Sequence, residues 1–117
     1  MNFKDQKPIY LQIAESICES ILAGKYRENE KLPSVREFAA EVEVNVNTVA
    51  RSFEWLQNQD VVATRRGLGN FVNECARESV LRIRRKEFFE EQVPEFFRTM
   101  KALGVTLEEI VSYIKNK

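Results

Sequence analysis

The side chains best suited to bind a polyanion gather between residues 32 and 72 of the 117-residue chain. Asn47, Thr48 and Arg51 fall close together on one expected helix, so they project from its first turns in one general direction. Short donor–acceptor side chains followed by an arginine suit the base edges and phosphates of a nucleic acid. The alternative is an ordinary solvated face, because any amphipathic helix has a polar side.

Two arginines and two glycines form a second candidate site, in the segment Arg65-Arg66-Gly67-Leu68-Gly69. The segment separates two β-rich runs, so it is expected to be the tip of a hairpin. Glycines permit positive φ and a close approach of the backbone to a surface. The neighbouring arginines suggest that this surface is a sugar-phosphate backbone or a minor groove. A plain exposed hairpin with solubilising charges is the alternative.

Catalytic and metal-binding patterns are absent from the sequence. The chain contains no histidine, which is the commonest general base and metal ligand. It also lacks a glycine-rich phosphate loop, a nucleophile elbow and a paired-carboxylate motif. Cys18 and Cys75 have no metal-binding spacing, and Cys18 falls in an apolar helical pattern that predicts a buried free thiol. We therefore expect neither an enzyme nor a site for a cofactor, metal or small-molecule effector.

Composition places the chain among ordinary globular proteins, with 44% hydrophobic and 31% charged residues. It has no apolar run near the ~20 residues that span a bilayer, and its polar N-terminus lacks a signal-peptide core, so a cytoplasmic protein is expected. The net charge is +0: residues 1–77 carry ten basic and eleven acidic side chains, and residues 78–117 carry eight and seven. Any affinity for DNA must therefore come from the local placement of a few arginines.

Three helices and a hairpin are expected to position these side chains. The first helix begins at Pro8, since proline suits a first turn, and ends at Gly24, a residue typical of left-handed caps. Ser34 and Glu37 form a capping box that starts the second helix, and Asn45 is a suitable N-cap for the third. The expected core faces are Ile9, Ile13, Ile17 and Ile21; Val35, Phe38, Ala39 and Val42; and Val46, Val49, Phe53 and Leu56.

Residues 77–117 are expected to form a separate helical tail. Apolar residues recur there at helical spacing, Pro94 marks a kink or break, and Thr106 with Glu109 predicts a capping box before a last short helix. The tail is too small to cover its own phenylalanines, and leaving several in water would cost on the order of several kcal/mol. A second copy of the chain is the simplest cover, which predicts dimerisation through Phe88, Phe89, Phe96, Phe97 and Met100.

The sequence resembles the DNA-binding domain of the GntR family of bacterial transcription regulators. The resemblance implies a winged helix-turn-helix whose third helix enters the major groove, and it implies a DNA contact for Arg36. The short tail is similar to that of the YtrA-type subfamily, in which this part is associated with dimerisation. The matching motifs are residues 8–13, 21–24, 32–37, 44–49 and 65–72.

Departures from the family pattern concern the reading of DNA. Many members place arginine where this chain has Val46 and Ala50, so the operator sequence does not transfer to this chain. Most members also have threonine where this chain has Asn70. Other polar residues at the third helix are therefore expected to contribute more to base recognition: Asn45, Asn47 and Arg51.

These observations predict a mostly α-helical chain with a small β-hairpin: a winged helix-turn-helix DNA-binding domain over residues 1–76 and a helical dimerisation region over residues 77–117. The predicted function is that of a homodimeric repressor that binds a palindromic operator in double-stranded DNA, with a transporter-linked operon suggested by the YtrA-type resemblance. The alternatives are a winged-helix protein-interaction module and a plasmid replication or partition protein. The predicted DNA-binding residues are Ser34, Arg36, Asn45, Asn47, Thr48, Arg51, Arg65, Arg66, Gly67 and Gly69.

Overall fold

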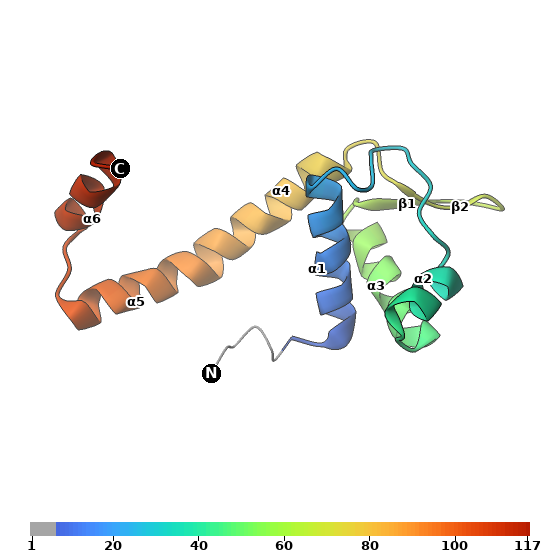
Figure 1. Ribbon diagram of the computed structural model, residues 1–117, viewed down its shortest axis with the longest axis horizontal. Helices are drawn as coiled ribbons and strands as arrows, with labels where there is room; N and C mark the ends of the chain where they lie inside the picture. The colour runs from blue at the N-terminus through green and yellow to red at the C-terminus, as the bar shows by residue number, and fades with distance from the viewer. Residues whose placement is uncertain (1–6) are drawn as a thin grey trace. The chain divides into compact units, whose positions relative to one another are not determined.

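The structure, a computed structural model, describes residues 7–117 and divides the chain into two compact units (Figure 1). The first unit extends to Leu81 and the second covers Arg82–Lys117, so the boundary falls inside helix α4. None of the helices in the described residues is long and apolar enough to cross a membrane. The elements in chain order are α1 (Ile9–Leu22), α2 (Val35–Val42), α3 (Val46–Asn58), β1 (Val62–Arg65), β2 (Gly69–Val72), α4 (Ala76–Glu87), the π-helical turn η2 (Phe88–Gln92), α5 (Val93–Leu103) and α6 (Leu107–Lys115).

Helix α1 follows the predicted bounds but buries a shorter stripe than predicted. Pro8 is its N-cap, and Gly24, with φ +84°, lies just beyond its end. The stripe Ile13, Ile17 and Ile21 is buried together with the Cys18 thiol, as predicted. Ile9 was wrongly placed in the core: it is 55% exposed, because it lies in the first turn, on the rim of a surface hollow rather than against another helix.

The helix-turn-helix begins with the predicted capping box. The Ser34 hydroxyl accepts a hydrogen bond from the Glu37 N–H, and the Glu37 carboxylate accepts one from the Ser34 N–H, both at 3.1 Å. Glu43, with φ +57°, turns the chain between α2 and α3. Val42 and Val46, expected in the core, are each 39% exposed, because Val42 ends α2 and Val46 begins α3, on either side of this turn.

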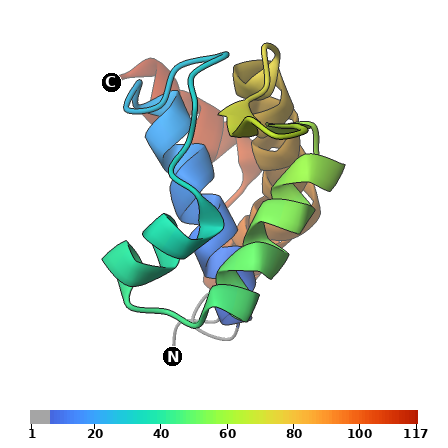
Figure 2. The same ribbon diagram turned by 90° about the vertical axis from the view of Figure 1, so that its right-hand side faces the viewer.

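Helix α3 is the centre of the first unit and packs against both α1 and α2 (Figure 2). The Asn45 side chain caps it by accepting from the Asn47 N–H at 2.8 Å, as predicted. Its inner face buries Val49, Phe53 and Leu56, which confirms three of the four predicted core residues. The Phe53 ring meets the Phe38 ring of α2 edge to face, with centroids 6.0 Å apart, so the second and third helices share one aromatic contact.

The hairpin packs its base on this core and leaves its tip in solvent. Strands β1 and β2 are antiparallel, with Val62 opposite Val72 and Arg65 opposite Gly69. Both valines are buried. The connection before α2 runs along the other edge of β2, where the Val72 N–H donates to Glu30 O at 2.8 Å. Strand β2 therefore has a partner on each side, which fixes the direction of the tip.

The second unit is helical throughout, apart from the short connection before α6. The chain stays helical across Pro94, where a kink or break was expected, because the π-helical turn η2 precedes it and the Val93 N–H donates to Phe88 O. This wider turn accommodates the proline, which lacks an N–H and crowds the preceding turn of an α-helix. Thr106 and Glu109 form the predicted capping box of α6. No residue of η2, α5 or α6 is buried.

Candidate nucleic-acid interface

Helices α1 and α3 begin at the same end of the first unit (Figure 2). Their first turns border a hollow of about 400 Å3. The structure thus brings together three of the predicted DNA-binding residues with the first turn of α1, a segment that the sequence analysis did not assign to the site. Among residues 7–117, no acidic side chain lines the hollow. Its lining is Pro8, Ile9, Tyr10, Asn47, Thr48 and Arg51.

Arg51 lies over the face of an aromatic ring in this hollow. Its guanidinium carbon is 4.0 Å from the centroid of the Tyr10 ring. The backbone carbonyl of Tyr10 in turn accepts a hydrogen bond of 2.7 Å from the hydroxyl of Ser52, which is fully buried. Tyr10 was missed by the sequence analysis; the signal that could have indicated it is its spacing of three and four residues before Ile13 and Ala14, which continues the buried face of α1 to its first turn.

Two predicted DNA-binding side chains already have hydrogen-bond partners inside the protein. Ser34 and Asn45 cap α2 and α3, so their side-chain oxygens accept from backbone N–H groups of the first turns. The Ser34 backbone N–H, and secondly its hydroxyl, lower the pKa of the Glu37 carboxyl. Arg36 is exposed on the first turn of α2 and does not line the hollow.

The hairpin tip, residues 65–69, carries the remaining predicted site residues. The Arg65 guanidinium lies 4.1 Å from the centroid of the Phe71 ring, while Arg66 projects from the exposed turn. Gly69 has φ +109°, and a Cβ atom there would lie 3.2 Å from Cε of Lys31. Positive φ at this glycine lets the strand pair start directly beside the turn. The result is a narrow exposed tip flanked by three cationic side chains.

A polar network ties this tip to α3. The Thr64 hydroxyl donates to Oδ1 of Asn70 at 2.7 Å, and the Gln57 amide donates to Thr64 Oγ1 and, at 3.4 Å, to Asn70 Oδ1. Asn70 is the residue that replaces the usual threonine of the resembled family. The network was not predicted, because it joins a helix to two strands that are separate in sequence.

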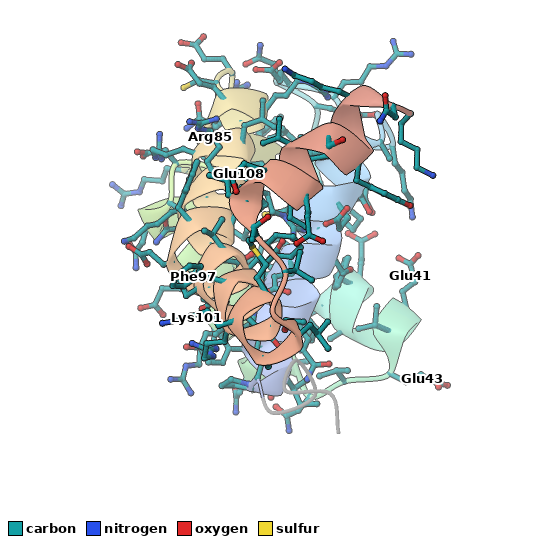
Figure 3. The ribbon with its side chains drawn as sticks, turned by 90° about the vertical axis from the view of Figure 1, so that its left-hand side faces the viewer. Glu41, Glu43, Arg85, Phe97, Lys101 and Glu108 are labelled. Atoms are coloured by element: carbon teal, nitrogen blue, oxygen red, sulfur yellow. The ribbon has the colours of Figure 1, made fainter. Side chains whose placement is uncertain are left out.

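Acidic side chains of the helix-turn-helix lie elsewhere. Glu41 on α2 and Glu43 in the turn after it project outward (Figure 3), and neither lines the hollow. The near-neutral composition therefore coexists with a hollow whose lining, among the described residues, includes the Arg51 guanidinium and no carboxylate. Among the residues that the structure describes, no group of three His, Cys, Asp or Glu side chains is placed to hold a metal ion.

Comparison with known proteins decides which fold family this geometry represents. The model of a family described as "Bacterial regulatory proteins, gntR family" matches residues 9–72, from the start of α1 to the end of β2. The chain belongs to the GntR family. The predicted winged helix-turn-helix fold is thereby confirmed, since solved GntR-family structures share it. The chain is a DNA-binding transcription regulator, and its family consists of regulators rather than enzymes.

Similarity to individual GntR-family regulators extends through the tail. The chain is 41% identical over 113 residues to the HTH-type transcriptional regulator YhcF of Bacillus subtilis, covering 97% of this chain and 92% of that protein. It is 31% identical over 112 residues to the transcriptional repressor YtrA of the same organism, covering 96% and 85%. A crystal structure of a GntR-family regulator from Bacteroides thetaiotaomicron matches with a TM-score of 0.81 and 43% identity, covering 93% and 95%.

Proposed function

We propose that this GntR-family regulator is a homodimeric repressor that binds a palindromic operator. The observation that carries the proposal is the grouping of Asn47, Thr48 and Arg51 in one hollow that no acidic side chain of the described residues lines. These side chains occupy the first turns of α3, the part of a recognition helix that reaches base edges in helix-turn-helix proteins. Amide and hydroxyl groups can pair with bases there, and the arginine can bind a guanine or a phosphate.

The wing and α2 are proposed to hold the DNA backbone. Arg66 and Arg65 flank an exposed, narrow tip, and Arg36 is exposed on the first turn of α2. Arginines on such elements fix the register of a protein on the duplex through phosphate contacts or enter a narrow minor groove. Ser34 and Asn45 contribute through the helix starts that they cap, because the first N–H groups of a helix favour a phosphate.

Dimerisation is assigned to the tail. One recognition helix reads too few base pairs to find an operator in a genome, and two copies related by a twofold axis read a palindrome. In the single chain, four phenylalanines of the tail remain 46–57% exposed, with Met100 half-buried beside them: Phe88, Phe89, Phe96 and Phe97. Repression is supported by similarity to YtrA, which is named a repressor.

The test is binding to duplex DNA that the protein itself selects from a random-sequence pool, together with the DNA upstream of its own gene. Gel shifts at two salt concentrations should show a specific complex with two half-sites, formed without added ligand. Arg51→Ala should weaken this complex by about 1–3 kcal/mol. Arg27→Ala is the matched control, since Arg27 is exposed beyond the far end of α1. Selection of no DNA, or equal losses in both variants, would contradict the proposal.

A further inference from the structure

We propose that Tyr10 is a positioning residue for DNA recognition: its ring holds the Arg51 guanidinium in the place from which that group contacts DNA. The inference rests on the proposed contact between Arg51 and the operator. It assigns a role to α1, a helix that contains none of the predicted DNA-binding residues. Three features of the first unit support it: the stacking geometry, the anchoring of the ring, and the open side of the guanidinium.

The stacking geometry is that of a cation–π pair. The guanidinium carbon lies 4.0 Å from the ring centroid, well within the ~6 Å over which an arginine is attracted to an aromatic face. Arg51 is otherwise an exposed side chain with many rotamers. Holding it over a ring before DNA arrives reduces the conformational entropy that binding would remove. The ring should therefore raise the affinity of Arg51 for DNA. Arg51 is expected to contribute more to base recognition here than in family members with further arginines on this helix.

The backbone that carries the ring is anchored to the helix that carries the arginine. Ser52 follows Arg51 in the sequence, is 0% exposed, and donates its hydroxyl hydrogen to the backbone carbonyl of Tyr10 at 2.7 Å. The same hydroxyl lies 3.2 Å from Thr48 O, one turn earlier in α3. The backbone beneath the ring is therefore fixed to the turn of α3 that presents the arginine, so that the two partners keep their spacing.

The stack leaves the arginine free to bind DNA. An aromatic ring covers one face of a guanidinium, and the five N–H groups lie in the plane of that group, so they remain available at its edge. Asn47 and Thr48 line the same hollow, which places the edge among the other residues proposed to contact bases. Bidentate recognition of a guanine or phosphate requires a well-positioned guanidinium, and a ring beneath it restricts its movement.

A second arginine of the first unit provides an internal control. Arg65 lies 4.1 Å from the Phe71 ring on the wing. This pair has nearly the same spacing as Tyr10 and Arg51 but sits on different elements. If each ring acts through its own arginine, then removing one ring should change the contribution of its own arginine and leave that of the other unchanged.

The experiment is a double-mutant cycle on the DNA duplex that the wild-type full chain selects from a random pool. Tyr10→Leu should weaken binding about fivefold, the size expected of one partly exposed cation–π pair. Tyr10→Phe keeps the ring and should bind as the wild type does. In the Arg51→Ala background, Tyr10→Leu should cause almost no further loss. Phe71→Leu combined with Arg51→Ala should be additive.

A second readout is the base preference of the variants. Repeating the selection with Tyr10→Leu should relax the same half-site positions that Arg51→Ala relaxes, which a general loss of stability would not do. Thermal unfolding identifies variants that do not fold, and Tyr10→Met replaces Tyr10→Leu in that case. Additive losses at Tyr10 and Arg51, or equal losses in Tyr10→Phe and Tyr10→Leu, would overturn the positioning role alone. Full affinity of Arg51→Ala would overturn the proposed DNA contact as well.

Discussion

Buried side chains are distributed very differently between the two units of this chain. Every buried hydrophobic residue of the described sequence lies at or before Val80, and the inner faces of α1, α3 and the hairpin meet in one core. In the second unit no large apolar side chain is buried, and many are exposed, from Val93 at 37% to Leu103 at 72%. The first unit can therefore stabilise itself, whereas the second has an apolar surface that its own helices do not cover.

Cations over aromatic rings show the same contrast. In the first unit Arg51 and Arg65 lie over rings that are half-buried in the module. In the second unit Lys101 lies 5.2 Å from the centroid of Phe97, one turn away on α5 (Figure 3), and that ring is 53% exposed. A ring that is half-buried against a folded module can position a cation for a ligand. A ring that another chain is proposed to cover must instead leave its cation at the rim of the interface.

Removal of the tail should separate the roles of the two units with the largest change in DNA affinity. A chain cut after Glu87 keeps the buried residues Ala76, Ser79 and Val80 of α4, so the first unit should still fold. Its affinity for the full operator should fall by about 10²–10⁴, because two half-sites are no longer bound by one linked pair. Sedimentation and gel shifts measure both effects. An intact chain that sediments as a monomer at micromolar concentration, with full operator affinity, would refute the role given to the tail.

A cut after Arg77 should behave differently. It removes Val80, which is 0% exposed in the first unit. Loss of a buried side chain of this size destabilises a protein by roughly 1.5–3 kcal/mol. The thermal midpoint of this shorter chain should therefore lie below that of the chain cut after Glu87. Equal midpoints would show that the first turns of α4 add nothing to the core.

A pair of phenylalanine substitutions sharpens the contrast between the units. Phe53→Ala opens a cavity in the core, where the ring is 2% exposed, and should cost about 3–5 kcal/mol of unfolding free energy. Phe97→Ala removes an exposed ring, so the first unit should keep its stability while the dimer dissociates about tenfold more readily. Calorimetry at several protein concentrations separates the two effects. An equal loss of the stability of the first unit in both variants would contradict the assignment of Phe97 to the dimer interface.

Two glycines of the wing test how far its tip depends on backbone geometry. Asparagine tolerates the left-handed region near φ +57°, so Gly67→Asn, at φ +77°, should be mild. Gly69→Asn places the residue at φ +109° in a strand pair and should cost about 1–3 kcal/mol of strain, shared between stability and DNA affinity. Footprinting should then show lost protection at the site of the wing. Equal behaviour of the two variants would exclude a conformational cause.

Local features of the fold were predictable because each depends on a few neighbouring residues. The capping boxes at Ser34 and Thr106 and the glycine after α1 are such features, since they are set by side-chain chemistry within one turn. Apolar periodicity was reliable in the middle of helices and failed at their ends: Ile9 and Val46 continue a stripe past the point where another element covers it. Apolar periodicity indicates which face of a helix points toward the core, but it does not indicate where the element packed against that face ends.

Contacts between distant segments were beyond the sequence. Ser52 and the Tyr10 carbonyl that it binds are 42 positions apart, and no pattern in either segment indicates the pair. The same holds for Gln57 and the two wing residues that it joins, Thr64 and Asn70. The candidate site was therefore predicted as a set of arginines and small polar residues. The rings and amides that position them became visible only when the helices and hairpin were placed together.

The two capping boxes offer a finer comparison. Ser34→Ala should cost about 1 kcal/mol of the unfolding free energy of the first unit, because α2 packs on the core and its end cannot fray independently. Thr106→Ala removes the same kind of cap from α6, which has no buried residue. Its effect should be local fraying, seen as faster amide exchange in α6 with no change in the unfolding of the first unit. A shared unfolding transition that shifts equally in both variants would show that the units are not independent.

The smallest expected effect is a pH dependence carried by Glu37. The Ser34 backbone N–H, and then its hydroxyl, lower the pKa of this carboxyl from its ordinary value of 4.5. A lowered folded-state pKa adds stability that is fully present above pH 4.5 and is lost as the pH falls through the folded value, where the carboxylate takes up a proton. Glu37→Gln should therefore differ most from the wild type at neutral pH and least in acid, in chemical denaturation series. Ser34→Ala keeps the backbone donor, which is the larger cause, and should retain most of the dependence. A wild-type advantage over Glu37→Gln that stays constant with pH would mean that the carboxylate stabilises α2 by a route other than these hydrogen bonds.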